Sequence, residues 1–556
     1  MRGRLRFGAL LAVVCMVSLG AVSAVSGKPT QSSNTFIFAG ASDPTYLDPA
    51  LVSDGESFRI TKQIFEGLVE LKPGTTTVTP ALARSWRVAR DGKTWTFRLR
   101  TGVKFHDGTP FNARAVCANF GRWFNFTGPF QDASATYYYR QIFGGFKRNE
   151  STGLGKPLFR GCSAKGKSVA IVRLTRRSGP FIPSLVLSAF SMQSPTAMAK
   201  YGANQGELRG GTFRPTGSYA FSHPTGTGPF KFNEWTVGQR VVLDRNGSYW
   251  GAKAKVSRLI VRPISNNTAR LQALQTGEVN GYDLVAPQDM PTIRGNNRLQ
   301  LINRRAFNVA YVTINQSKPP MNRKIVRQAV AHGLDRASVV RSFYAGRAVV
   351  AHQFMPPSVP GYNPSVKKYG FDPERSKRLL RQAGLTLPVK IEFYWPTNVS
   401  RPYMPSPNLN FAAFKASLER SGFEVTAVSQ PWRPDYVKNV NQGTGGHLNM
   451  IGWTGDYGDA DNFVGTFFQS ANPQFGLTRT GEHKAIALLL DKAEAEVNPK
   501  KRIALYKRIS ALIAEFVPAV PYAHTTPAVA VERRVRGYVA SPVGSESYRG
   551  VSVGGQ

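Results

Sequence analysis

The chain has 556 residues, of which 42% are apolar and 19% are charged, and it contains three cysteines. This length suggests several lobes of about 100–200 residues each instead of one core. The apolar content excludes a disordered chain, and so few cysteines exclude a small scaffold stapled by disulfides.

The net charge is strongly positive, because 72 Lys and Arg stand against 33 Asp and Glu, which gives +39. A charge of this size is typical of proteins that bind nucleic acid or another polyanion. The basic residues are scattered along the chain, with no run longer than three. We therefore favour a solvated basic surface and expect no nucleic acid as partner. A loose association with anionic polymers of the cell envelope stays open.

The N-terminus has the pattern of a secretory signal peptide. Three arginines within the first six residues precede an apolar stretch at 9–22, and small residues follow up to Ala24. We expect cleavage after Ala24, which removes three charges and leaves +36. An uncleaved anchor is disfavoured because the stretch is shorter than the ~20 residues of a membrane span. Lipidation of Cys15 is disfavoured because no small residue precedes it. The mature protein should be soluble and exported, either periplasmic or associated with the cell envelope.

Between residues 36 and 320 the pattern is rich in strands. Asp91-Gly92 is a strong hairpin signal, and the alternation that follows it at 94–100 predicts a half-buried strand. The sequence at 106–110 predicts another turn, and Asn112 should begin a helix.

Cys117 and Cys162 remain after the expected cleavage. In an oxidising compartment two remaining cysteines often pair, and the cross-link contributes about 3–4 kcal/mol in the chain-entropy model. We expect a disulfide between them. Two buried thiols are the alternative, because sequence spacing does not show whether the Cα atoms lie within bonding range.

Helices become prominent from about residue 268. Thr268 is expected to cap a helix that Gly277 ends, and apolar residues at 325–334 recur at helical spacing. Asp372-Pro373-Glu374 reads as an N-cap, a first-turn proline and an acid that favours the helix dipole, with Gly384 as the stop. Strands and helices alternate at 388–470, which predicts a βαβ-like lobe.

The C-terminal part is expected to hold a late helix and then strands. Apolar residues between Ile503 and Phe516 lie on one helical face, and Pro518 ends that helix. The tail at 519–556 returns to strand-like sequence punctuated by glycine.

No motif in the chain demands an enzyme. There is no phosphate-cradling G-x-x-x-x-G-K-[ST] sequence, and none of the seven histidines forms an H-E-x-x-H pair. Residues 550–554 match the G-x-S-x-G nucleophile elbow by letter, but they end two residues before the C-terminus. We interpret them as a terminal strand. We expect no catalytic residue, no metal and no cofactor.

Several strings together resemble a known family. The string DGKTWTFRLRTGVKFHDGTPFNARAV at 91–116 closely resembles the signature of the family 5 extracellular solute-binding proteins of ABC importers, which bind dipeptides, oligopeptides or nickel. The similarity covers nearly the whole mature chain, and the closest likeness is to the dipeptide-binding proteins. Further matching strings are YLDPA (46–50), IFEGLVEL (64–71), GTGPFKF (226–232), ARLQALQTGEV (269–279), RKIVRQAVAHGLDRASVV (323–340), YGFDPERSKRLLRQAGL (369–385) and GWTGDYGDADNF (452–463).

The resemblance implies an α/β protein with the bilobed periplasmic-binding-protein-like fold of class II and an extra subdomain in the first lobe. Ligand would be enclosed between the lobes by hinge closure and delivered to a permease in the cytoplasmic membrane. The protein would be a monomer and catalyse nothing. The implied division is 1–24 signal peptide, 34–77 lobe 1, 78–222 extra subdomain, 223–308 lobe 1, 309–525 lobe 2 and 526–556 a C-terminal return to lobe 1.

The resemblance also implies a ligand site. In the dipeptide-binding proteins an aspartate of GWTGD pairs with the ligand's α-ammonium, an arginine of RPY with its α-carboxylate, and a tryptophan lies between them. These positions are Asp456, Arg401 and Trp432 here. A zwitterion taken out of water needs a fixed counter-charge at each end, and arginine's planar fork suits a carboxylate. Tyr403 would add a flat wall, and Trp453, Ser53 and Glu56 complete the predicted site.

Other interpretations remain open at this point. Without the resemblance, Asp456 among glycines reads as a turn residue, Arg401 as a solvated cation and Trp432 as ordinary core. The spacing of 55 residues from Arg401 to Asp456 is slightly longer than expected, and an acidic Glu56 on the first-lobe wall would favour a cationic ligand. The same fold would equally suit a receptor for another solute, such as a nickel chelate, haem or an opine. A secreted polyanion-binding protein is the alternative from a different class.

Overall fold

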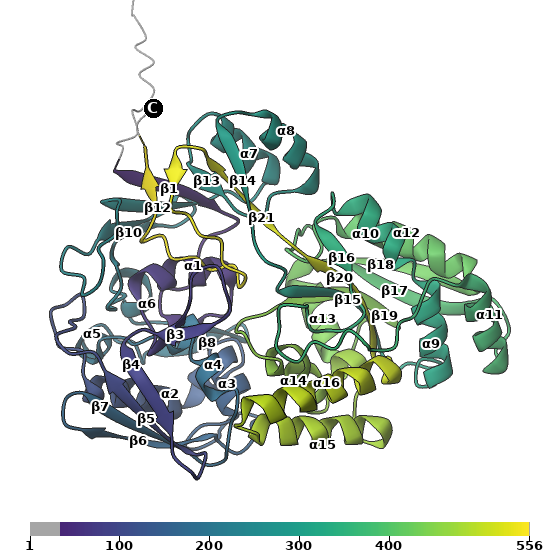
Figure 1. Cartoon of the computed structure of the whole chain (residues 1–556), viewed down its shortest axis with the longest axis horizontal. Helices are drawn as coiled ribbons and strands as arrows, with labels where there is room; N and C mark the ends of the chain where they lie inside the picture. The colour runs from purple at the N-terminus through teal and green to yellow at the C-terminus, as the bar shows by residue number, and fades with distance from the viewer. Residues whose placement is uncertain (1–33, 555–556) are drawn as a thin grey trace, which may run out of the picture.

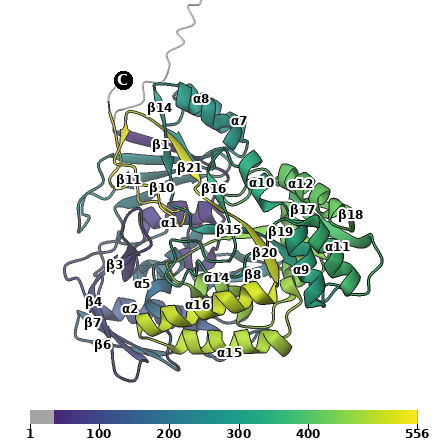
Figure 2. The same ribbon diagram turned by 45° about the vertical axis from the view of Figure 1, so that its right-hand side comes forward.

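Two open sheets form the centres of two lobes that lie beside each other in the computed structural model, which describes residues 34–554 (Figures 1 and 2). The predicted signal peptide and Cys15 lie outside the described residues. Within 34–554, no helix is both long enough and apolar enough to cross a bilayer. The molecule is mixed α/β, as the sequence predicted, and neither sheet closes into a barrel.

The first lobe is built on a seven-stranded sheet in which β1 (Thr35–Gly40) pairs in parallel with both neighbours, while the other pairings are antiparallel. Helix α1 (Gly55–Ile64) buries one face beneath it. The strand order is β10 (Phe230–Thr236), β11 (Arg240–Arg245), β12 (Arg258–Pro263), β1, β13 (Gly281–Tyr282), β21 (Ala528–Glu532) and β14 (Leu299–Asn303).

Two further helices flank this sheet, α7 (Asn267–Gln275) and α8 (Met290–Gly295). The prediction that Thr268 caps α7 is wrong, because the helix begins earlier. The side chain of Asn266 accepts a hydrogen bond from the N–H of Ala269 and so caps the helix two residues before the predicted position. Asparagine and threonine are both good caps, so sequence alone did not separate them.

A separate four-stranded antiparallel sheet follows in the chain, with helix α2 (Ala113–Phe124) packed on one face. The Asp91-Gly92 turn joins its first two strands: the Asp91 carboxylate accepts from the N–H groups of Lys93 and Thr94, and Gly92 has a φ of +67°. The predicted alternation is confirmed, since Trp95, Phe97 and Leu99 are buried. The strand order is β4 (Ala83–Val88), β5 (Thr94–Leu99), β7 (Val169–Leu174) and β6 (Phe159–Lys165).

A disulfide ties helix α2 to this sheet. Cys117 lies on the helix and Cys162 on β6, and their Cα atoms are 5.2 Å apart. The bond closes a loop across a sequence separation of 45 residues. The remaining small elements of this part are β2 (Val69–Leu71), β3 (Val78–Pro80), β8 (Gly206–Arg209), β9 (Thr212–Pro215), α3 (Tyr137–Phe143), α4 (Phe181–Ser184), α5 (Pro195–Lys200) and α6 (Tyr219–Ser222).

The second lobe contains a six-stranded sheet with a parallel part, which confirms the predicted βαβ arrangement. Strand β17 runs parallel to both of its neighbours, and helix α12 (Pro407–Arg420) makes the crossover between β17 and β18. The strand order is β16 (Ala348–Val350), β20 (Ala519–Thr525), β15 (Asn308–Ile314), β19 (Leu448–Thr454), β17 (Val389–Thr397) and β18 (Phe423–Pro431).

Helices cover this second sheet with the caps that the sequence predicted. The carboxylate of Asp372 accepts from the N–H of Arg375 at the start of α11, and Gly384 follows that helix with a φ of +68°. The bounds are α9 (Lys324–Gly333), α10 (Arg336–Phe343), α11 (Pro373–Gln382), α13 (Val437–Gln442), α14 (Asp461–Phe468), α15 (Gly481–Ala495) and α16 (Pro499–Phe516).

The chain crosses between the two sheets twice within the described residues, from β14 to β15 and from β20 to β21. A buried ion network holds the first crossing. Arg304 donates to Asp283 and Glu546, and Arg59 of α1 donates to the same Asp283. Burial by itself raises the pKa of Asp283, but the charges of Arg304 and Arg59 outweigh it and hold that pKa well below its usual range.

The disulfide yields the first testable prediction. Replacing Cys117 and Cys162 together by serine should lower the thermal midpoint, because the cross-link restricts the unfolded chain by about 3–4 kcal/mol in the chain-entropy model. Ligand affinity should stay within twofold, since both cysteines belong to the four-stranded sheet and its helix and are not among the predicted site residues. Scanning calorimetry and titration calorimetry on the same preparation measure both quantities. An unchanged midpoint, or two free thiols in the exported protein, would contradict the prediction.

Candidate functional site

The candidate site lies at one edge of the sheet in the second lobe. Strands β17, β18 and β19 are parallel to one another, so their carboxyl ends meet at the same edge. Arg401 and Tyr403 follow β17, Trp432 follows β18 directly, and Asp456 follows β19 by two residues. In open α/β sheets, ligands bind outside the carboxyl ends of the strands. Four of the predicted residues, distant in sequence, are thus brought to one edge.

Both chain crossings emerge at this same edge. Asn308 at the start of β15 pairs with Thr454 at the end of β19. The Asn308 side chain accepts from the N–H of Thr525, the last residue of β20, and donates to its carbonyl. The edge that carries the candidate residues therefore faces the first lobe, next to the segments on which the lobes would rotate.

Asp456 is a partly exposed carboxylate with no cationic partner among the described side chains. Its Oδ1 accepts a hydrogen bond of 2.7 Å from the hydroxyl of Tyr138, and its Oδ2 accepts one of 3.2 Å from Asn462. No Lys, Arg or His among the described side chains lies within 4 Å of it. Burial raises the pKa of Asp456 to about 6, against the lowering effect of these two hydrogen bonds. The carboxylate is therefore mostly ionised at neutral pH, and its two side-chain donors among the described residues are neutral.

The Tyr138 hydroxyl joins the two lobes at this point. Tyr138 belongs to α3 in the first part of the chain, 318 residues from Asp456, and is 8% exposed. Burial raises the pKa of Tyr138 strongly, and the negative charge of Asp456 raises it further. The tyrosine is consequently a hydrogen-bond donor throughout the physiological range. The sequence analysis missed it, because one tyrosine in the run at 137–139 carries no signal that distinguishes it.

Other contacts bring the lobes together around Asp456. Tyr457 is 2% exposed and packs into the hydrophobic core beneath the four-stranded sheet. Gly458 lies so close to Thr76 that a Cβ atom there would be 2.4 Å from the Thr76 carbonyl oxygen. Farther out, the N–H of Gly179 donates to the carbonyl of Glu494 at 2.7 Å. The lobes are therefore in direct contact, with Asp456 inside the seam.

Arg401 is also without a carboxylate partner among the described side chains. Its guanidinium carbon lies 5.0 Å from the centre of the Trp432 ring, a cation–π contact, and its Nε atom is buried with no hydrogen-bond acceptor. Trp432 in turn stacks on Tyr436 at 6.0 Å between ring centres. Trp432 therefore positions the guanidinium.

Tyr403 is buried, and Trp453 is half-buried. Tyr403 is 3% exposed and packs over Gly452, where a Cβ atom would be 2.4 Å from its ring. Burial raises the pKa of the Tyr403 hydroxyl, and the neighbouring Arg401 charge opposes that rise. The indole N–H of Trp453 donates to the same Asn462 oxygen that accepts from the backbone N–H of Asp456. Tyr403 thus neighbours Arg401, and Trp453 shares the Asn462 side chain with Asp456.

Glu56 and Ser53, the two residues predicted on the first-lobe wall, have different surroundings. Glu56 accepts hydrogen bonds from Arg59 at both oxygens, so the ion network described above engages its charge. Ser53 is exposed and directly precedes Asp54, whose charge contributes to the raised pKa of Tyr138. Ser53 thus lies on the side of the seam that approaches Asp456, whereas Glu56 is tied to Arg59.

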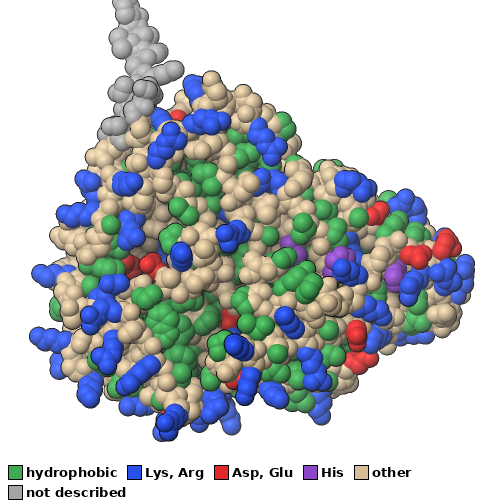
Figure 3. Space-filling view, viewed as in Figure 1, with side chains coloured by type: hydrophobic (Ala, Val, Ile, Leu, Met, Phe, Trp, Pro, Cys, Tyr) green, Lys and Arg blue, Asp and Glu red, His purple; other side chains and the backbone are tan. Residues whose placement is uncertain are grey.

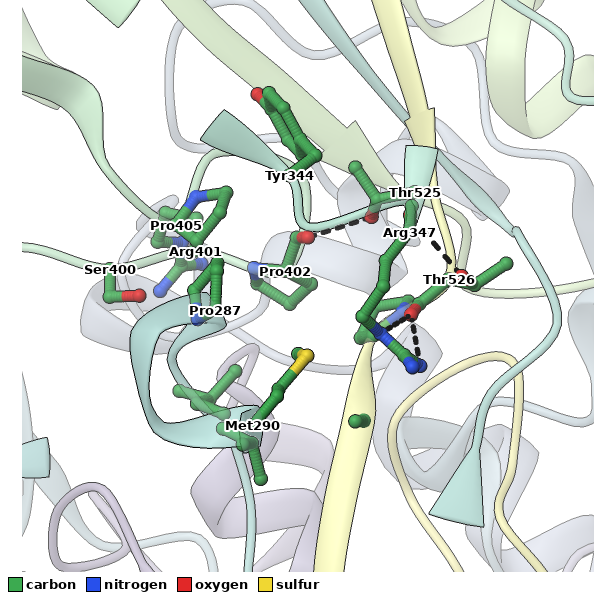
Figure 4. Close-up of a pocket in the computed structure, with 14 residues that line it drawn as sticks. Pro287, Met290, Tyr344, Arg347, Ser400, Arg401, Pro402, Pro405, Thr525 and Thr526 are labelled. Carbon is green, nitrogen blue, oxygen red and sulfur yellow. Dashed lines mark hydrogen bonds between the residues drawn. The ribbon is translucent and has the colours of Figure 1, made fainter. Parts of the chain in front are cut away.

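A small hollow of about 30 Å³ lies between the lobes beside Arg401 (Figure 4). Its walls come from the loop before α8, from the segment around Arg401, and from the second chain crossing. Met290 and Pro287 form the first-lobe side, and the carbonyl of Pro402 accepts a hydrogen bond of 2.7 Å from Thr525. No carboxylate lines this hollow. No cluster of three or more metal-ligating side chains occurs within residues 34–554.

Comparison with known proteins places this geometry in a family. The model of the bacterial extracellular solute-binding proteins, family 5, matches residues 77–475. A dipeptide-binding protein of Escherichia coli is 30% identical over 550 residues, 97% of this chain and 98% of that protein. A heme-binding protein A of Haemophilus influenzae is also 30% identical, over 95% of this chain and 94% of that protein.

The fold agrees with a solved structure of a similar protein. It is an ABC transporter-associated periplasmic binding protein from Helicobacter pylori, in complex with the peptide STSA. That structure superposes with a TM-score of 0.76 at 28% identity, covering 93% of this chain and 98% of that one. A coverage of 93% extends the similarity over both lobes.

The raised pKa of Asp456 leads to a prediction about stability. Its pKa is about 6 in the folded protein and near 3.8 in an unfolded chain. The folded state therefore binds the extra proton between those values, and stability falls as pH rises through that window. Asp456→Asn cannot ionise, so its thermal midpoint should exceed that of the wild type at pH 8, and the difference should vanish near pH 4.

Asp91→Asn is a matched control, for which we expect the opposite change in thermal midpoint. The exposed Asp91 has its pKa lowered, mainly by the N–H group of Lys93, so it stabilises the turn when ionised. Its replacement should lower the midpoint at pH 8. Differential scanning calorimetry between pH 4 and 8 measures both variants, and an Asp456→Asn midpoint below the wild type at pH 8 would refute the argument.

Proposed function

The chain belongs to the bacterial extracellular solute-binding proteins of family 5, and from this we propose that it captures a short peptide between its lobes. The peptide is then delivered to an ABC permease in the cytoplasmic membrane. One observation supports the proposal most: Asp456 and Arg401 lie at the same sheet edge, each without an opposite charge among the described side chains. A free peptide carries the two complementary charges.

In this proposal Asp456 binds the α-ammonium group and Arg401 the α-carboxylate. Ion pairing with a ligand offsets the cost of holding each charge away from water. Tyr138 donates to Asp456 from the opposite lobe, so closure of the lobes completes the site around the ligand. The names of similar proteins support a peptide, since relatives in Escherichia coli and Pseudomonas aeruginosa are called dipeptide- and di/tripeptide-binding proteins.

Another solute in the same fold is the second candidate. One relative is named a heme-binding protein, and solved structures with this fold include complexes with agropinic acid and with Fe(III)-EDTA. The latter two share about one fifth of their residues with this chain, so they support the fold alone. The free carboxylate of Asp456 favours a ligand with a cationic group, which distinguishes a peptide from a purely anionic chelate.

The division of the chain and its other partners remain proposals. Lobe 2 at 309–525 is supported by the strands of the six-stranded sheet, which lie between Asn308 and Thr525. We also propose a monomer that associates loosely with anionic envelope polymers. Lys and Arg side chains are spread over the face shown in Figure 3, and acidic ones are few. Such an association would weaken in high salt, because surface charges are screened.

The proposal predicts paired losses of affinity. Asp456→Ala should weaken binding of Ala-Leu by about a hundredfold or more, because a ligand charge left without its partner costs ~2–5 kcal/mol. N-acetylation of the peptide should weaken binding to the wild type but add little further loss in Asp456→Ala. C-terminal amidation should behave in the same way with Arg401→Ala. Titration calorimetry measures each combination.

Exposed residues of the same lobe supply controls for this experiment. Glu424→Ala on β18 and Arg378→Ala on α11 remove a carboxylate and a guanidinium that are solvent-exposed. Both should bind Ala-Leu as the wild type does. If the acetylated and amidated peptides bind the wild type as tightly as the free peptide, the charge clamp is wrong and the second candidate is favoured.

The pKa of Asp456 sets a pH dependence for binding. Only the ionised carboxylate pairs with an ammonium group, so affinity should be highest near pH 7, above which the peptide's own α-amino group, with a pKa of about 8, loses its charge. Affinity should fall toward tenfold per unit below the value of about 6. Asp456→Asn should bind weakly with no such dependence between pH 4.5 and 8. Tryptophan fluorescence titration across this range is the measurement, and a wild-type affinity that rises on acidification would contradict the assignment.

A further inference from the structure

A second arginine, Arg347, lies at the hollow beside Arg401. In Figure 4 the Arg401 guanidinium lies near Ser400 and Pro287, and that of Arg347 lies across the hollow near Thr526. Arg347 follows α10 in the second lobe and is 9% exposed. It was not predicted from the sequence, where it is one arginine among many.

Arg347 is held in place by neutral acceptors. Its Nε and Nη2 donate to the carbonyl of Thr526 at 2.9 and 2.7 Å, and Nη2 also donates to the side chain of Asn303 at 2.7 Å. Its Nη1 has no hydrogen-bond acceptor among the described residues. Burial lowers the pKa of Arg347, and the charge of Arg294 lowers it further. These contacts orient the guanidinium without neutralising it.

Other buried arginines in the described chain are engaged differently. Arg59, Arg304, Arg122 and Arg502 each pair with a buried carboxylate. Arg327 and Arg336 donate to several backbone carbonyls and do not line the hollow. Arg401 and Arg347 thus differ from both groups, because both line a hollow and neither has a carboxylate partner among the described side chains.

Asp289, the acidic residue of the loop before α8, does not neutralise the positive charge of Arg401 and Arg347. Asp289 lies between Pro287 and Met290 in the chain but does not line the hollow. Burial raises its pKa, and Arg270 supplies the opposing positive charge. The electrostatic environment of the hollow is therefore positive, and its first-lobe wall of Val285, Pro287 and Met290 is apolar.

The size of the hollow selects the kind of group that fits. Its volume of about 30 Å³ corresponds to about two water-sized groups at ~10–15 Å³ each. The two oxygens of one carboxylate occupy that room. An apolar wall beside a cation suits a side chain with a short methylene stem and an acidic end.

We propose that Arg347 determines specificity for peptides whose C-terminal residue is acidic, Asp or Glu. This inference rests on the proposed function, which places the α-carboxylate of the ligand at Arg401. The side chain of that residue branches from the carbon that bears the α-carboxylate, so it extends from Arg401 into the hollow, which has room for the side-chain carboxylate. Its carboxylate then pairs with Nη1 of Arg347, and its methylene groups contact Met290.

Titration calorimetry with four peptides tests this subsite in the wild-type protein at 0.15 M salt. Ala-Asp should bind at least tenfold more tightly than Ala-Asn, which has the same shape without the charge. Asp-Ala and Asn-Ala carry the charge change at the N-terminal position, and their affinities should agree within about threefold. This pair controls for the attraction of any acidic peptide by the positive net charge.

Two variants of Arg347 locate the effect. In Arg347→Met the affinity ratio of Ala-Asp to Ala-Asn should fall toward one, and in Arg347→Lys, which keeps the charge, most of the ratio should remain. If either variant fails to fold, the inference is decided by the wild-type affinity ratios alone, Ala-Asp to Ala-Asn and Asp-Ala to Asn-Ala. Equal affinities for Ala-Asp and Ala-Asn, or an equal gain at both peptide positions, overturn the inference and leave peptide capture intact. If none of the four peptides binds, peptide capture itself fails and the inference fails with it.

Discussion

An ionised carboxylate held between two lobes by neutral donors is the constraint on which this site depends. Asp456 accepts hydrogen bonds from Tyr138 and Asn462, and no cation among the described side chains balances it. Burial disfavours its charge, as its raised pKa shows, and proteins usually pair a charge in such a place. Holding this charge unpaired costs free energy in the unliganded state. A ligand with a positive group recovers that free energy when it binds.

The scaffold keeps this charge in position by using the edge of a parallel sheet. Residues that follow β17, β18 and β19 meet there, although they come from segments up to 55 residues apart, from Arg401 to Asp456. The two chain crossings leave from the same edge. Movement of the lobes therefore changes the surroundings of the site while its own residues stay on one rigid element.

Arginines serve two distinct purposes in the molecule. Arg59 and Arg304 are paired with Asp283 and Glu546 in a buried network that fixes the first crossing, and breaking such a network by removing one partner is strongly destabilising. Arg401 and Arg347 are oriented by a ring and by carbonyl groups, which leave their charge available. Arg401 and Arg347 differ from the paired arginines because they line the hollow and have no carboxylate partner among the described side chains.

Local elements followed from the sequence because their causes are local. The Asp91-Gly92 turn, the alternation at 94–99, the Asp372 cap and the late helix ending before Pro518 each depend on neighbouring residues. The N-cap at 266 was missed because two good capping residues lie two positions apart. The strings shared with the family pointed to Asp456 and Arg401 but did not say what surrounds them.

Tertiary structure decided which charged side chains at the site are paired with an opposite charge. The run of three tyrosines at 137–139 does not reveal that Tyr138 reaches Asp456 across 318 residues. Arg347 is one of many basic residues until the second crossing brings Thr526 and Arg401 beside it. The strings that resemble a known family indicated the class of protein, and local patterns indicated its elements. The balance of charge at the site depends on contacts between distant segments, and those contacts exist only once the lobes have folded.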